Sequence, residues 1–111
     1  MDSRESNLQE LLQFARPIDE LTRTLSAYGW DCPEPLVALS PMHLSSVLKR
    51  YLAGELSGAQ IEQWANAIEG REDVHYLPSS STGLALHELA NPLLTCPLTR
   101  QSATTLVADL S

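Results

Sequence analysis

Residues 41–69 carry the strongest structural pattern in the chain, that of two short amphipathic helices separated by a turn. Ser40 and Pro41 are typical of a helix start, because serine caps free amides and proline lacks only an N–H that the first turn leaves unbonded. Ser57 and Gln60 form a second start signal, the capping box. Apolar residues then recur every three or four positions, which predicts helices over 41–53 and 58–69, packed as an antiparallel hairpin. The residues expected at their contact are Leu44, Val47, Leu48, Tyr51, Ile61, Trp64 and Ile68.

The flanking sequence extends the helical pattern in both directions. Residues 5–28 have helical apolar spacing, but Pro17 removes a backbone hydrogen bond, so we expect two helices or one kinked helix there. After the serine-rich segment 78–83 we expect a helix capped near Ser81 or Thr82 and ended by Pro92, then a last helix capped by Thr99. The apolar run 36–39 is either an extended connector or a lone strand, and only the run 74–77 could pair with it; both are too short to predict a sheet. The expected fold is all-α: one domain over residues 1–111, a small bundle of five or six helices built around the central hairpin.

The charge balance restricts the class of partner. Fourteen acidic residues against seven basic ones give a formal net charge of −7. Such a chain repels phosphate backbones, so direct nucleic-acid binding is not expected, whereas a basic protein surface is a natural partner. The alternative is that the acidity only keeps the protein soluble. No apolar run is long enough to span a membrane, and the N-terminus lacks the apolar core of a secretory signal, which predicts a cytoplasmic protein.

The residues that most often carry chemistry are too scattered to predict an enzyme. The three histidines, His43, His75 and His87, lack the i, i+4 spacing of a zinc-binding helix. Cys32 and Cys96 cannot hold zinc alone and are expected to be free thiols. We therefore predict no catalytic residue, no metal and no cofactor. The alternative is a small metal-dependent hydrolase, in which the serine-rich loop would bring His75 and His87 together with Glu88.

Acidic residues gather where a helix would not favour them. Carboxylates at a helix C-terminus face the negative end of the helix dipole, which costs a few tenths of a kcal/mol each, so a chain selected only for stability would place lysine or arginine there. The acids could form a surface for a cationic partner, with an aromatic side chain as an interface anchor, or they could be a solvated face. The predicted partner-binding residues are Glu62, Glu69, Glu72, Asp73 and Tyr76.

Two segments, Leu-Lys-Arg-Tyr-Leu-Ala-Gly-Glu-Leu-Ser at 48–57 and Trp-Ala-Asn-Ala-Ile-Glu-Gly-Arg-Glu-Asp at 64–73, together with Glu-Leu-Ala-Asn-Pro at 88–92, resemble a set of small uncharacterised bacterial proteins. The overall plan of a short acidic helical domain is similar to colicin-type and contact-dependent-inhibition immunity proteins. Those proteins bind and block one toxin, often a basic nuclease. This resemblance implies a non-enzymatic inhibitor that covers a cationic toxin domain with carboxylates. The alternative is a regulatory or structural subunit that packs on a partner through an apolar helix face.

Overall fold

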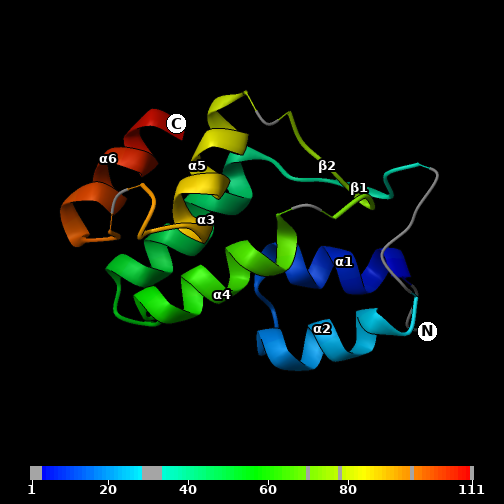
Figure 1. Cartoon of the computed structure of the whole chain (residues 1–111). Coiled ribbons are helices and arrows are strands. Elements are labelled where there is room, and N and C mark those ends of the chain that lie inside the picture. The colour runs from blue at the N-terminus through cyan, green and yellow to red at the C-terminus, as the bar shows by residue number, and fades with distance from the viewer. Residues whose placement is uncertain (1–3, 29–33, 70, 78, 96, 111) are drawn as a thin grey trace.

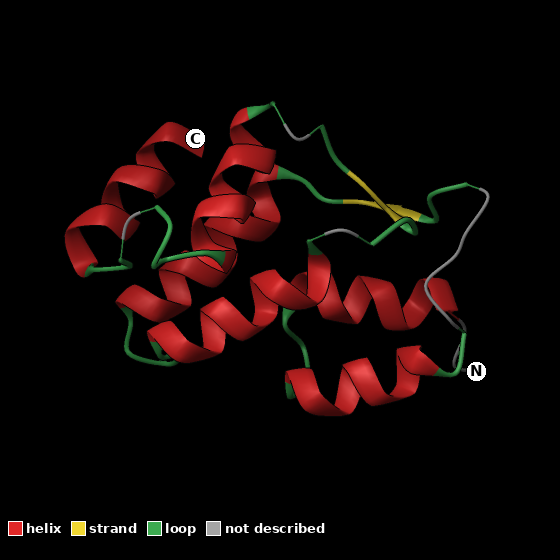
Figure 2. Cartoon of the chain, in the orientation of Figure 1, coloured by secondary structure: helices red, strands yellow, loops and turns green. Residues whose placement is uncertain are grey.

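The computed structural model describes residues 4–28, 34–69, 71–77, 79–95 and 97–110. Within these ranges the chain forms a small helical bundle, which confirms the all-α fold class (Figures 1 and 2). In chain order its elements are α1 (Arg4–Gln13), α2 (Ile18–Ser26), β1 (Val37–Ala38), α3 (Pro41–Leu52), α4 (Gly58–Ile68), β2 (Val74–His75), α5 (Ser81–Ala90) and α6 (Arg100–Leu110).

The two central helices, α3 and α4, begin and end within a residue of their predicted bounds. The capping box before α4 forms as expected: the Gln60 amide donates to Ser57 Oγ at 3.1 Å, and the Ser57 amide donates to Gln60 Oε1 at 2.8 Å. All the predicted contact residues are buried except Tyr51, which is half-buried. Other helices contribute to burying these side chains, because α3 packs mainly against α6 and α4 packs mainly against α5.

The start of α3 depends on a histidine. Ser40 is its N-cap residue, and the Ser40 backbone N–H donates to Nδ1 of His43 at 3.0 Å. Nδ1 can accept this hydrogen bond only when it carries no proton. Partial burial also favours the unprotonated imidazole, since it lowers the pKa of His43 below its usual value.

We therefore expect acid to weaken the fold through His43. Because the pKa of His43 is lower in the folded chain than in the unfolded one, its contribution is complete above about pH 6.5 and is lost as the pH falls from there through the folded-state pKa. Urea unfolding at several values between pH 7.5 and 5 should show this loss. His43→Gln keeps an acceptor at the same position but does not titrate, so its stability should decline less. An equal decline in both proteins would contradict the assignment.

The N-terminal pattern breaks before Pro17, as predicted, and forms α1 and α2 side by side (Figure 1). Phe14 turns the chain out of α1 with a φ of 50°, in the left-handed region. Arg16 then joins the two helices, because its guanidinium donates to Glu10 at 2.6 Å, Glu20 at 2.8 Å and Asn7 at 3.0 Å. The free carbonyl of Phe14 accepts a hydrogen bond from Arg50 Nη1 at 2.9 Å, which ties the end of α1 to α3.

The two short apolar runs, from which no sheet was predicted, do pair with each other. β1 and β2 form a two-residue parallel pair, with Val37 opposite Val74 and Ala38 opposite His75. The main-chain carbonyl of Asp73 extends this pairing, since it accepts from the amides of Leu36 and Val37. Each run was too short to predict alone, but each completes the other's backbone hydrogen bonds. The two strands lead into α3 and α5, which brings the starts of these helices to one side of the bundle (Figure 1).

The core joins all six helices, and Trp64 is its largest fully buried side chain. Its indole Nε1 donates to the Leu11 carbonyl at 2.7 Å, so α4 is bonded to α1 across the core. Buried leucines of α1, α2, α3 and α5 belong to the same core. No helix in the described part of the chain is long and apolar enough to cross a bilayer. Cys32 and Cys96, expected to be free thiols, lie outside the described residues.

Candidate functional site

The acidic residues predicted to form one surface do not all face the solvent. Glu62 and Glu72 are exposed, Glu69 is half-buried, and Asp73 is fully buried. The prediction that Asp73 contributes to an exposed acidic surface is therefore wrong. Its position beside the β1–β2 pair turns its carboxylate inward, where a partner protein cannot reach it.

The Asp73 carboxylate is held by two arginines from distant parts of the chain. Arg71, which is also buried, donates from Nε to Oδ1 at 2.9 Å and from Nη2 to Oδ2 at 3.0 Å. Arg4, at the start of α1, donates from Nε to Oδ2 at 3.0 Å. Burial by itself would raise the pKa of Asp73, but the hydrogen bonds and charges of Arg71 and Arg4 outweigh burial and lower it. Asp73 therefore has a structural role, joining α1 to the strands.

Glu69 ends α4 and is bonded to α5. Its Oε2 lies 2.9 Å from Nδ1 of His87, and its Oε1 accepts from Asn91 Nδ2 at 3.2 Å. This small cluster lies on the surface where α4 and α5 pack together. The unfavourable carboxylate at the end of α4 thus gains partners that the sequence pattern did not indicate.

Glu72 and Tyr76 lie on either side of β2, on the segment that follows Glu69. Tyr76 is half-buried and packs against the core, so it is not the exposed anchor that the sequence suggested. Glu72 is exposed but takes part in interactions within the protein. The five predicted residues therefore do not form one continuous exposed site.

The three histidines lie on different elements of the fold. His75 is exposed on β2, His87 is bonded to Glu69, and His43 caps α3. In the described ranges no three His, Cys, Asp or Glu side chains are arranged to hold a metal ion. The grouping of His75 with His87 and Glu88 that a metal-dependent hydrolase would need is therefore absent there.

Other acids do come together, around two adjoining hollows beside α5 and α6. The larger hollow, of about 510 Å³, lies between α5 and α6, with Glu88 and Asp109 in its lining. The smaller one, of about 160 Å³, extends it to the start of α4 and includes Glu62. Among the described residues that line them, every charged side chain is acidic. We call both hollows together the α5–α6 groove; its lining consists of Gly58, Glu62, Glu88, Leu89, Pro92, Pro97, Leu98, Thr99, Gln101, Ser102, Thr105, Leu106 and Asp109.

Sequence reasoning identified only part of this groove. Glu62 was predicted as a partner-binding residue, Glu88 was considered only as a metal ligand, and Asp109 was missed. These acids lie on three different helices, α4, α5 and α6, so no local spacing relates them. Only the packing of α4 and α6 against α5 brings them to one surface.

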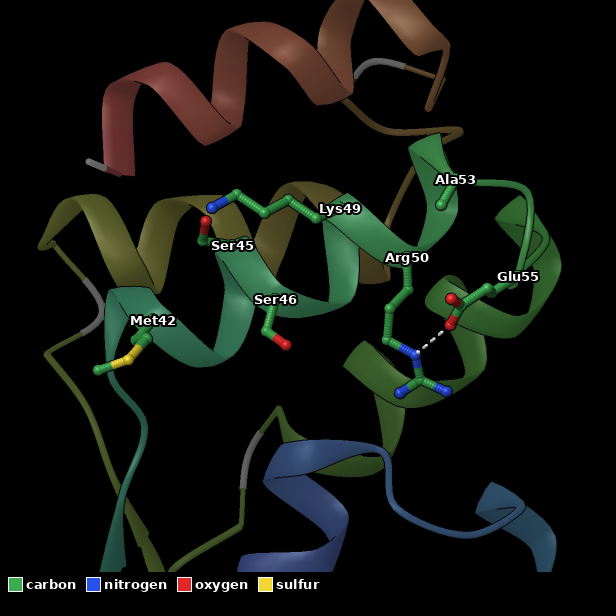
Figure 3. Close-up of a pocket in the computed structure, with 7 residues that line it drawn as sticks. All are labelled: Met42, Ser45, Ser46, Lys49, Arg50, Ala53 and Glu55. Atoms are coloured by element: carbon green, nitrogen blue, oxygen red, sulfur yellow. Dashed lines mark hydrogen bonds and ion pairs between the residues drawn. The ribbon is translucent and has the colours of Figure 1, made fainter.

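A third hollow, of about 410 Å³, lies over α3 and has the opposite charge character (Figure 3). Its lining includes Lys49 and Arg50 beside small hydroxyl residues. Figure 3 shows Arg50 turned toward Glu55, with Nε 3.2 Å from Oε2. Arg50 also donates to the carbonyl at the end of α1, so its guanidinium is already engaged in contacts within the fold. This hollow is therefore a weaker candidate than the α5–α6 groove.

Comparison of the chain with protein-family models, with curated proteins and with solved structures gives no match. Any function must therefore be argued from the residues and their geometry.

Proposed function

We propose that this protein is a non-enzymatic binding protein that neutralises one basic partner, in the manner of an immunity-type inhibitor bound to a cationic toxin domain. The observation that carries the proposal is the α5–α6 groove, whose two hollows are lined by Glu62, Glu88 and Asp109 and whose described lining has no basic side chain. Complementary charge accelerates encounter with a basic surface and disfavours acidic competitors. The net charge of −7 and the resemblance to immunity proteins support the same partner class.

Glu69 extends this acidic surface along α4. It lies seven residues after Glu62, which is close to two helical turns, so the two acids project from the same side of α4. Its bonds to His87 and Asn91 hold its carboxylate at the junction with α5. In this proposal Glu62, Glu88 and Asp109 meet the partner, Glu69 flanks them, and Asp73 is not involved.

Binding kinetics against the protein encoded beside its gene would test the proposal. We expect the triple variant Glu62→Gln, Glu88→Gln and Asp109→Asn to associate about tenfold more slowly at low salt, because long-range charge governs encounter. The difference should shrink at high salt, where such interactions are screened. A variant that associates as fast as the parent at both salt concentrations would overturn the proposal.

A matched control removes the same charge elsewhere. Glu5→Gln in α1, Asp19→Asn in α2 and Glu34→Gln, three residues before β1, change three exposed acids that do not line the groove. Figure 1 shows α1 and α2 at the end of the bundle opposite α6. If the groove is the binding surface, this control should associate nearly as fast as the parent. Equal slowing of both triple variants would mean that only the overall net charge matters.

The second candidate, a subunit that packs on a partner through apolar residues, is favoured by Leu93 and Leu94. They are 99% and 80% exposed, which is unusual for adjacent leucines. Partner binding that does not change with salt, and that is lost when these leucines are replaced, would favour this candidate over the electrostatic one.

A further inference from the structure

The α5–α6 groove has an apolar floor between its acidic side chains. Leu89 of α5 is almost completely buried, while Leu98 and Leu106 are half-buried, and all three line the groove together with Pro92 and Pro97. A purely electrostatic contact would need no such floor. The arrangement of apolar floor and charged edge is typical of protein surfaces that receive an amphipathic segment.

The last helix, α6, leaves part of its apolar side uncovered. Ala103 is its one fully buried residue in the range Arg100–Leu110. Leu106, Val107 and Leu110 pack against the core but remain half-exposed. An amphipathic helix is stabilised by burying its whole apolar stripe, so a further element could cover the remainder.

The two exposed leucines follow Pro92, at the edge of the groove, and a hydrogen-bonded turn holds them there. The carbonyl of Asn91 accepts from the amides of Leu94 and Thr95, both at 3.0 Å. Thr95 Oγ1 also donates to the Glu88 carbonyl at 3.1 Å, which ties the turn to α5. Leu93 and Leu94 are therefore presented outward by a defined turn.

We propose that the α5–α6 groove binds an amphipathic helix of the basic partner protein. The apolar side of that helix would lie over Leu98 and Leu106 and against Leu93 and Leu94, while its lysines and arginines would face Glu62, Glu88 and Asp109. This inference rests on the proposed function and adds the form of the partner's binding segment.

Two observations favour a helix as the occupant. The groove is bounded by helices, and the ridges of one helix fit the grooves left between others. The strands of the described chain pair with each other near α1, so the groove borders no sheet edge to which an extended segment could add. The acidic edge then selects a cationic helix over a neutral or acidic one.

The test uses a synthetic 18-residue peptide with leucines at helical i, i+3, i+4, i+7 spacing and lysines elsewhere. Titrated into ¹⁵N-labelled protein, it should shift amide resonances of residues 58–62, 86–91, 93–95 and 98–109 and leave those of α1 and α2 unchanged. A peptide of the same composition, with its leucines distributed around the helix, should bind at least tenfold more weakly. Absence of binding, equal binding of both peptides, or shifts spread over all acidic surfaces would overturn the inference.

A pair of double variants tests the leucines. Leu93→Ser with Leu94→Ser should weaken peptide binding about tenfold or more, since each leucine loses apolar area that the helix would cover. Met42→Ser with Leu77→Ser removes two other exposed apolar side chains, 75% and 61% exposed, and should bind like the parent. If the leucine variant also binds like the parent, the inference fails. The proposed function has a separate test. It fails if the triple variant of Glu62, Glu88 and Asp109 associates with the protein encoded beside the gene as fast as the parent does.

Discussion

Trp64→Ala is expected to lower the free energy of unfolding by about 3–5 kcal/mol, the cost typical of truncating a buried aromatic residue. Trp64 is fully buried at the meeting of α4 with α1, so its loss leaves a cavity. It also removes one of the two hydrogen bonds to the Leu11 carbonyl, which keeps the 3.1 Å bond from the Phe14 amide, and a single hydrogen bond contributes about 0.5–1.5 kcal/mol. Urea unfolding followed by far-ultraviolet circular dichroism would measure the change.

Trp64→Phe separates the two contributions to this effect. Phenylalanine fills much of the indole volume but cannot donate to Leu11, so we expect this variant to be more stable than Trp64→Ala and less stable than the parent. A loss below about 1 kcal/mol for Trp64→Ala, as expected of a surface position, would contradict the burial of Trp64 and make it a candidate interface residue.

Asp73→Ala should destabilise the fold by a similar amount, about 3–5 kcal/mol, because it leaves Arg71 and Arg4 without their carboxylate. Arg71 is buried, so water cannot readily replace the lost partner. An exposed acid of α4 offers a control: Glu62→Gln should change the free energy of unfolding by less than about 0.5 kcal/mol. Chemical unfolding at pH 7 would compare the two.

The pH dependence gives this prediction a second readout. Because the pKa of Asp73 is lower in the folded chain than in the unfolded one, its stabilisation is present above about pH 3.9 and is lost as the pH falls through the folded-state pKa. Asp73→Asn should remove this part of the acid destabilisation while keeping the size of the side chain. Equal effects of changing Asp73 and Glu62 would show that the network with Arg71 does not stabilise the protein.

The acidic run at 69–73 is where the predicted site and the structure differ most. From the sequence, Glu69, Glu72 and Asp73 belong to one predicted partner-binding surface. The structure instead buries Asp73 against Arg71 and Arg4, so neutralising it should destabilise the fold. Asp73 lies beyond the end of α4 and directly before β2, and the pairing of β2 with β1 turns its carboxylate inward. The sequence pattern did not predict that pairing.

Local chemistry in the sequence determined the helices and their ends. The capping box of Ser57 and Gln60, the break before Pro17 and the cap at Thr99 each act within a few residues, so spacing alone predicts them. The buried side of the helices follows in the same way, because apolar residues at helical spacing must face one direction. Trp64 was placed in the core for this reason, and it is there.

Tertiary structure alone decided which charged residues reach the surface together. The β1–β2 pair joins segments 37 residues apart, and Arg4 meets Asp73 across 69 residues. Glu62, Glu88 and Asp109 likewise come together from three helices to line the groove. Apolar periodicity identifies the buried side of one helix, but it does not identify the neighbouring helix. The arrangement of neighbours depends on how all the side chains of the core pack together. The helices can therefore be predicted from the sequence, whereas the candidate site depends on how they pack.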